Sequence, residues 1–197
     1  AISGKELFDI EEDSKGNLWL AIFREGIDIY NPKSAQFKRI QYEEHNPLSL
    51  SSNKIRVIQA IGAYDFLVGT EGSGIDHITV DENYEMISKT NYRNQRNDPK
   101  SLSHDIITDI FRDDKNRLWL STFGGGLNLF DDELGNFRRI NVQDGLPSDL
   151  VVSIIEDNLN NICVGTNKGL SKIDKDFNVH NFDSYDGLQS TEYYNAA

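Results

Sequence analysis

The sequence predicts an all-β fold built from repeated units of four short antiparallel strands. Apolar residues alternate with polar residues over short runs, and this period of two is typical of strands with one buried face. Turns rich in Gly, Asn and Asp separate the runs. The block Leu18-Trp19-Leu20 recurs as Leu118-Trp119-Leu120, at an offset of 100 residues. Such self-similarity predicts a repeat architecture.

Four copies of the unit align along the chain. Trp19, Leu67, Trp119 and Cys163 occupy the same position in successive copies, with spacings of 48, 52 and 44 residues. Four-stranded units of this length are the blades of a β-propeller, which closes on itself with about four to eight blades. We therefore expect a partial β-propeller over residues 1–197, with about four blades of a larger, seven-bladed ring. The predicted blades cover residues 7–42, 54–92, 105–142 and 150–183, and residues 184–197 begin a further, truncated blade.

Two kinds of residue are predicted to hold the blades together. Trp19 and Trp119 are expected to be wedges buried between neighbouring blades, and Cys163 is expected to fill the same position as a small buried apolar residue. Glycines open the third strand of each blade, where a positive φ or a close approach of two strands would require them. These glycines are Gly26, Gly74, Gly126 and Gly169.

The connections between blades also repeat, and we call them joints. Asn46-Pro47-Leu48-Ser49-Leu50-Ser51 matches Asp98-Pro99-Lys100-Ser101-Leu102-Ser103, and the third joint contains Asp144-Gly145-Leu146-Pro147. Proline and glycine favour turns at the surface. We expect all the joints to lie at one end of the blades.

Composition and charge exclude several classes of function. The chain has 197 residues, 38% of them apolar, which is enough to bury a core. Its net charge of −12 disfavours nucleic acid and anionic membrane surfaces as partners, because both require a basic field. It contains no run of about 18 apolar residues, so we expect no direct membrane insertion by this segment. With one cysteine, and four histidines at unrelated positions, we expect no metal and no cofactor.

The fourth unit carries a more specific pattern. Ile154-Ile155-Glu156-Asp157 is followed by the run from Asn161 to Thr166 and by Gly169-Leu170. Together with the two types of joint, this pattern resembles the two-component regulator propeller repeats, and the resemblance covers essentially the whole chain. The departures are the degenerate turn of the second blade, Ile22 where the other blades have threonine, and Cys163 in place of Trp.

The resemblance implies the periplasmic sensor region of a Bacteroides-type hybrid two-component histidine kinase, the extracytoplasmic part of an inner-membrane protein. Such a region would detect a carbohydrate or another nutrient and signal through a membrane helix to the kinase. The kinase, phosphoacceptor and DNA-binding parts are absent from this sequence, so we expect the segment itself to catalyse nothing. Expected partners are an oligosaccharide or other nutrient ligand, the remainder of the propeller and sensor, and a second copy in a homodimer of the parent protein.

Candidate ligand contacts come from the turns between the second and third strands and from the joints, which share one face of a propeller. A sugar ring needs an apolar surface for its C–H groups and planar polar groups for its hydroxyls. The alternative for each residue is an ordinary solvated turn. Arg93 lies in the basic joint 92–97, which could hold an anionic sugar through bidentate contacts or cap an inter-subunit surface. The candidates are Arg24, Glu25, Glu71, Arg93, Phe123, Asn167 and Lys168.

Two other functions stay open at this point. The chain could be a protein-interaction propeller that dimerises or docks another protein through its faces. It could also be a glycosidase or lyase, which needs paired carboxylates about 5 to 10 Å apart, and Glu25 and Glu71 are the pair to consider. The acidic turns at residues 11–17 and 113–116 favour a hairpin over a calcium site, because they lack alternating acidic ligands.

Overall fold

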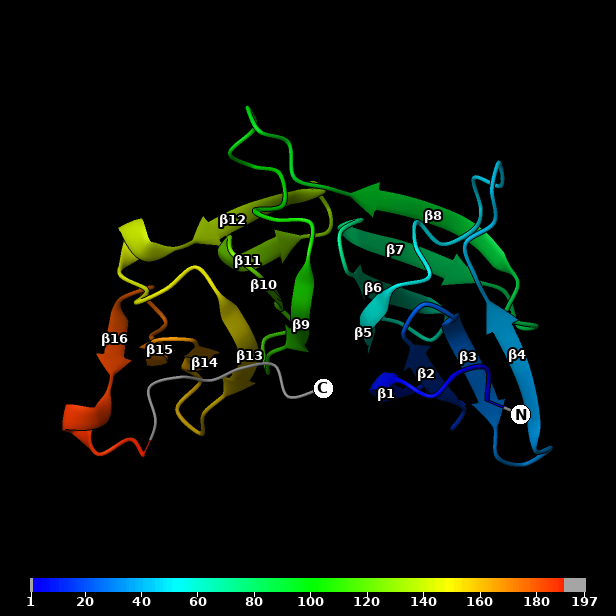
Figure 1. Ribbon diagram of the computed structural model, residues 1–197, viewed down its shortest axis with the longest axis horizontal. Helices are drawn as coiled ribbons and strands as arrows, with labels where there is room; N and C mark the ends of the chain where they lie inside the picture. Colours follow the sequence, from blue (N-terminus) through cyan, green and yellow to red (C-terminus); the bar gives the residue numbers. More distant parts are fainter. Residues whose placement is uncertain (1, 190–197) are drawn as a thin grey trace. The chain divides into compact units, whose positions relative to one another are not determined.

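The structure is a computed structural model that describes residues 2–189. The described residues form four antiparallel sheets of four strands each, and in every sheet the strands lie side by side in chain order (Figure 1). This confirms the prediction of an all-β chain with about four blades. The chain divides into two compact units, with the first ending at Tyr92 and the second beginning at Arg93. Each unit contains two blades.

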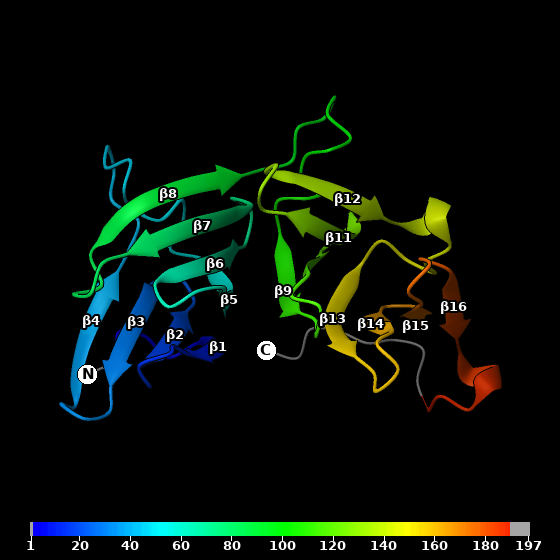
Figure 2. The same cartoon turned by 180° about the vertical axis from the view of Figure 1, so that it is seen from behind.

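Unit 1 contains the first two sheets. Strand β1 of the first sheet lies beside β5 of the second, so the first strands of the two blades are neighbours (Figures 1 and 2). The first sheet comprises β1 (Leu7–Glu12), β2 (Leu18–Ile22), β3 (Gly26–Asn31) and β4 (Gln36–Ile40). The second comprises β5 (Ile55–Ala60), β6 (Asp65–Thr70), β7 (Ile75–Val80) and β8 (Met86–Tyr92).

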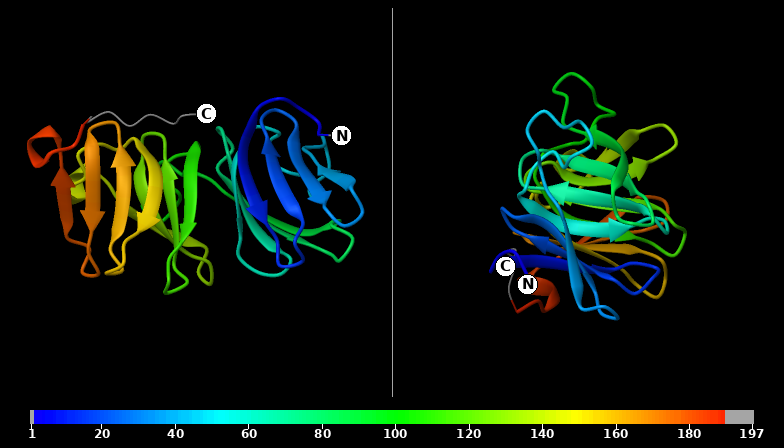
Figure 3. Two further views of the ribbon diagram at one scale, coloured as in Figure 1. Left: turned by 90° about the horizontal axis from the view of Figure 1, so that it is seen from below. Right: turned by 90° about the vertical axis from the view of Figure 1, so that its right-hand side faces the viewer.

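Unit 2 repeats this arrangement, and Figure 3 shows the alternating strand directions of its last sheet. Its first sheet comprises β9 (Ile107–Arg112), β10 (Leu118–Thr122), β11 (Gly126–Asp131) and β12 (Asn136–Ile140). Its second comprises β13 (Val151–Glu156), β14 (Ile162–Thr166), β15 (Gly169–Ile173) and β16 (Val179–Phe182).

Each sheet buries an alternating set of apolar side chains against the neighbouring blade of its own unit. In unit 1 the Trp19 ring is fully buried and stacks on Phe66 of the next blade, with ring centroids 3.8 Å apart. Trp119 lies in the corresponding cluster of unit 2, with its ring centroid 6.2 Å from that of Phe177. Cys163 is only half-buried, which corrects the prediction of a buried residue at this position.

A carboxylate at the start of the β1–β2 and β9–β10 turns orients each tryptophan. Asp13 Oδ1 accepts the backbone N–H of Asn17 at 2.9 Å, and Asp13 Oδ2 accepts the indole N–H of Trp19 at 3.2 Å. In unit 2, Asp113 Oδ2 accepts the indole N–H of Trp119 at 2.9 Å. The acidic turns are therefore hairpins closed by their own aspartate, as the sequence predicted.

The joints repeat because their serines and leucines have fixed structural roles. Leu50 is fully buried, and the Ser49 hydroxyl donates to the Glu43 carbonyl at 3.0 Å, closing the loop on itself. The Ser51 N–H and hydroxyl then donate to the buried Asp76 carboxylate on β7, at 2.7 and 2.6 Å. In unit 2, Ser103 N–H donates to Asn128 Oδ1 at 3.0 Å in the same way.

Two short 3₁₀ helices occur where the sequence predicted only turns. They are η1 (Val142–Asp144) and η2 (Ser184–Asp186), and each ends at a glycine with a positive φ. The predicted beginning of a further blade at 184–197 includes η2, whereas residues 190–197 lie outside the described residues. Over the part of the chain that is described, no helix is both long and apolar enough to cross a membrane.

Candidate ligand-binding rim

The turns between the second and third strands pack against the joints, as expected for one end of a propeller. In unit 1, Gly26 N donates to the Asn53 carbonyl at 3.1 Å and the Gln41 side chain donates to the Glu25 carbonyl at 2.9 Å. Glu71 N donates to the Lys54 carbonyl at 2.9 Å. We call this end of unit 1 the rim. It consists of the turns 23–25 and 71–74, the joint 41–54, and the first residues of β1 and β5.

A β-bulge at the start of each first strand directs one side chain to this end. In β1 the pairing with β2 skips from Leu7 to Asp9, and in β5 the pairing with β6 skips from Ile55 to Val57. The skipped residues are Phe8 and Arg56. Bulges re-aim side chains in this way and are frequent next to functional sites.

Five side chains of the rim form a continuous series of contacts, which we call the rim cluster. The Phe8 and Phe23 rings lie 4.9 Å apart between centroids. The Arg56 guanidinium carbon lies 5.2 Å from the Phe8 centroid, and the Arg24 guanidinium carbon lies 5.2 Å from the Phe23 centroid. Arg56 Nη1 pairs with Glu71 Oε2 at 3.0 Å. The cluster thus brings an aromatic surface, two cations and a carboxylate together.

This combination suits a saccharide. Aromatic faces accept the C–H surface of a sugar ring, and guanidinium and carboxylate groups supply paired donors and acceptors for hydroxyls. The Arg56 and Glu71 side chains are 16% and 33% exposed, so their ion pair is partly shielded and geometrically defined. Ion pairs fully open to water contribute less to stability.

The structure links two of the predicted candidates, Arg24 and Glu71, through the cluster. Glu25 lies in the same turn, half-buried, and its carbonyl accepts from Gln41. Because the Glu71 carboxylate is bound to Arg56, Glu71 is held as a polar contact rather than as a free acid or base.

The other four candidates lie in unit 2. Arg93 is exposed in the joint, and its Nη2 donates to Asp105 Oδ2 at 2.9 Å. Phe123 is exposed and forms an isolated β-bridge with Leu150. Asn167 is half-buried, with a buried Oδ1 that has no protein partner among the described residues, and Lys168 is exposed beside it.

Unit 2 has bulges at the same positions but places different residues there. Its skipped residues are Thr108 and Val152. The Thr108 hydroxyl donates to the Val151 carbonyl at 2.6 Å, and Val152 is buried. The aromatic and cationic chemistry of the bulges is therefore a property of unit 1.

Phe8 and Arg56 are not among the candidates predicted from the sequence. For Arg56, the spacing of the apolar residues in β5 indicates the bulge. Ile55 and Ile58 are both buried although they lie three residues apart, and strict alternation does not allow this on one face of a strand. The extra residue indicates a bulge.

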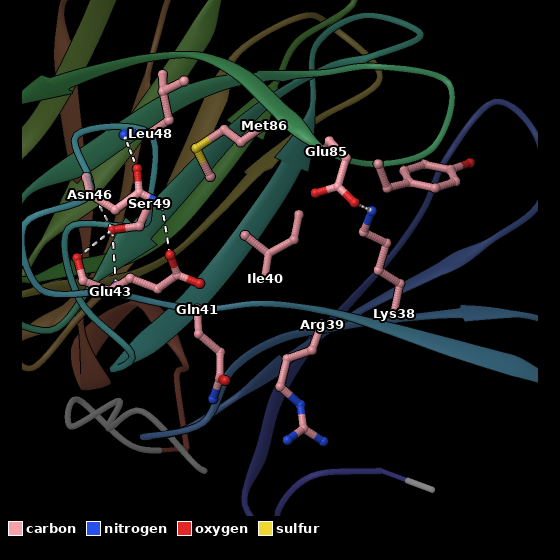
Figure 4. Close-up of a pocket in the computed structure, with 11 residues that line it drawn as sticks. Lys38, Arg39, Ile40, Gln41, Glu43, Asn46, Leu48, Ser49, Glu85 and Met86 are labelled. Carbon is pink, nitrogen blue, oxygen red and sulfur yellow. Dashed lines mark hydrogen bonds and ion pairs between the residues drawn. The ribbon is translucent and has the colours of Figure 1, made fainter.

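A pocket of about 250 Å³ lies elsewhere in unit 1, at the outer edges of β4 and β8. Figure 4 shows Lys38 and Ile40 turned toward Glu85 and Met86, whereas Arg39 and Gln41 point the other way. Lys38 pairs with Glu85, and the Asn46, Ser49 and Glu43 groups bond to one another. These polar groups bond to one another, and the Lys38–Glu85 pair links the two blades across the pocket.

Metal chemistry receives no support from the described residues, which contain no group of three His, Cys, Asp or Glu residues placed to hold an ion. Burial raises the pKa of the Cys163 thiol, and the Asp157 carboxylate adds to this effect. A raised pKa keeps the thiol protonated and poorly nucleophilic.

A family model described as "Two component regulator propeller" matches residues 101–124. These residues run from the second joint through β9 and β10 into the next turn. Residues 101–124 are thus similar to one two-component regulator propeller repeat. The predicted resemblance is thereby confirmed.

Histidine kinase P4 of Formosa agariphila is 25% identical to this chain over 188 residues. The alignment covers 93% of this chain and 13% of the kinase, so the chain spans a small part of that relative's length.

Several solved structures share the fold. The extracellular domain of a hybrid two-component system of B. thetaiotaomicron superimposes with a TM-score of 0.78 at 22% identity, covering 92% of this chain and 25% of that one. PorZ, a surface component of the type-IX secretion system of Porphyromonas gingivalis, gives 0.70 at 19% identity over 98% of this chain and 30% of that one. Virginiamycin B lyase from Staphylococcus aureus gives 0.65 at 13% identity, with coverages of 90% and 55%. At these identities the likeness shows the fold.

Proposed function

We propose that this chain belongs to the periplasmic sensor region of a hybrid two-component histidine kinase and that it recognises a carbohydrate-derived nutrient at the rim of unit 1. The remainder of the parent protein would carry the signal across the membrane to the kinase. The observation that carries the proposal is the rim cluster, on a chain with a regulator propeller repeat.

A sensing role fits the cluster better than catalysis does. The glycosidase alternative needs one carboxylate free to donate or accept a proton and a second to act with it. Glu71 is instead bound to the Arg56 guanidinium. The likeness to virginiamycin B lyase, at 13% identity, concerns the fold and supplies no catalytic residue to this chain.

The test is a calorimetric titration of the chain with a panel of neutral and acidic oligosaccharides. We expect one class to bind with measurable heat and the Phe23→Ala variant to lose that heat, because Phe23 supplies part of the apolar surface. Leu159→Ala is the matched control, since Leu159 is 79% exposed and lies in the β13–β14 turn. Absence of heat across the whole panel would contradict direct sensing by this chain.

A second, compatible role is packing against further blades. Ile10 is 53% exposed, whereas its equivalents Ile58 and Ile154 are almost fully buried against the tryptophan of the preceding blade in their units. We propose that the Ile10 face of unit 1 receives another blade of the parent propeller or, in a homodimer, a second subunit.

A further inference from the structure

We propose that the rim cluster selects a saccharide that carries negative charge, as a carboxylate or a sulfate, and that Arg24 is the residue that binds this charge. This inference rests on the proposed carbohydrate sensing and names the class of ligand.

The first observation is the backbone at Arg24. Its φ is +69°, in the left-handed region that disfavours residues with a side chain. The equivalent turn residues of the second and third blades are Gly72 and Gly124, with φ of +103° and +116°. An arginine here stores strain that glycine would avoid, and such strain tends to occur where a side chain is needed for function.

The second observation is how the two arginines are used. The Arg56 guanidinium is paired with Glu71, so that pair is locally neutral. Arg24 is exposed and its guanidinium lies over the Phe23 ring. An arginine held over an aromatic ring keeps its charge and its N–H donors, which can make bidentate contacts with a carboxylate or a sulfate.

The third observation is that the Arg24 cation lies in a chain that is acidic as a whole. The net charge is −12, which repels anions at long range. The Arg24 cation, held over the Phe23 ring that contacts Phe8, can offset this repulsion locally. It also places the charged group of a sugar next to the surface that receives the ring.

The experiment compares wild type with Arg24→Gly, using tetragalacturonate and its fully methyl-esterified form as probes. The ester has the same rings without the charge. We expect wild type to bind the acid at least about tenfold more tightly than the ester, and Arg24→Gly to lose that preference, because charge-assisted hydrogen bonds contribute about this much. A sulfated galactan tetrasaccharide, run in parallel, shows whether sulfate or carboxylate is the preferred group.

Two controls separate this role from a structural one. Arg24→Gly should melt at the same temperature as wild type or higher, since glycine relieves the strained φ. Lys33→Gln removes one exposed positive charge from the β3–β4 turn, at the opposite end of the same blade, and should bind like wild type.

Each outcome is decisive. Acid binding that Arg24→Gly weakens to the level of the ester, in a variant that melts normally, supports the proposal. Equal binding of acid and ester, or unchanged acid binding by Arg24→Gly, overturns it while leaving carbohydrate sensing intact. A large drop in the melting temperature of Arg24→Gly would show that Arg24 is structural and also overturns it. If neither the acids nor the ester nor any neutral oligosaccharide binds, the proposed function fails with it.

Discussion

The Asp113 carboxylate joins a turn, a strand and the core of unit 2. It accepts from Trp119 Nε1 at 2.9 Å, from the backbone N–H of Arg117 at 2.8 Å, and from Arg117 Nε at 2.6 Å. Asp13 does the same in unit 1, where the Tyr84 hydroxyl of the next blade also donates to it at 2.9 Å. Each carboxylate therefore couples the closure of a hairpin to the placement of a tryptophan.

Replacing Asp113 with alanine should destabilise the protein by about 2 kcal/mol, because it leaves buried donors without an acceptor. Urea unfolding followed by tryptophan fluorescence would measure the change. Asp114→Ala is the control, because Asp114 is exposed and its variant should stay within about 0.5 kcal/mol of wild type. Equal stability of the two variants would contradict the role given to Asp113.

Stability should fall in acid for the same reason. Burial alone would raise the pKa of Asp113, but hydrogen bonds from Trp119 and Arg117 outweigh it and hold the pKa below its ordinary value; Asp13 behaves alike. Such groups stabilise the fold above an unfolded pKa of about 4, and this contribution is lost as pH falls through the lower folded pKa. Burial raises the pKa of Asp9, which opposes the trend.

The pKa is also lowered at Asp81, Asp157 and Asp174, so lowered carboxyl pKa values outnumber the raised one at Asp9. We therefore expect a loss of stability below about pH 4. Urea midpoints between pH 7 and pH 2.5 would show this loss. The midpoint of Asp113→Asn should fall less steeply below pH 4 than that of wild type. Midpoints that stay constant to pH 2.5 would show that these carboxylates do not control stability.

At the scale of elements, the glycine that opens β11 has less room for a side chain than the glycine in the β6–β7 turn. A Cβ on Gly126 would lie 2.3 Å from the Ile140 carbonyl oxygen of β12, and its φ is +78°. A Cβ on Gly72 would meet nothing within 4 Å, although its φ is +103°. Of these two glycines, Gly126 therefore has an added steric requirement that comes from strand spacing, whereas Gly72 does not.

We expect Gly72→Ala to cost about 1 kcal/mol from backbone strain and Gly126→Ala to cost clearly more, because the clash forces β11 and β12 apart. Thermal unfolding of both variants would compare them. Equal melting temperatures would mean that the close approach of β11 and β12 is not needed.

The blades and joints could be predicted from the sequence because they depend on local chemistry that repeats. The alternation around Trp19 and Trp119 recurs at fixed positions with the same strand pairing. The serine backbone contacts recur in the first two joints. The rim cluster could not be predicted in full. Phe8 and Arg56 meet only because a bulge shifts each by one position and because β1 lies beside β5, and neither fact is local to the sequence around them.

At the scale of the whole molecule, the exposed Ile10 face should make the isolated chain associate. Exposed apolar surface that is buried in equivalent blades favours contact with another copy. Ile10→Arg should lower the apparent mass measured by light scattering at high concentration. Ile87→Arg is the control, because Ile87 is also exposed, at 57%, but lies on the outer strand β8. A monomeric wild type would contradict this use of the Ile10 face in the isolated chain.

The most direct test of the rim as the recognition site is hydrogen–deuterium exchange with the oligosaccharide that gives the largest binding heat. Turns 23–25 and 71–74 should become protected, together with the start of β5, while turns 32–35 and 81–85 at the other end of the blades stay unchanged. Protection confined to those opposite turns, or to the outer pocket around Asn46 and Met86, would contradict the assignment of the rim of unit 1 as the site of recognition.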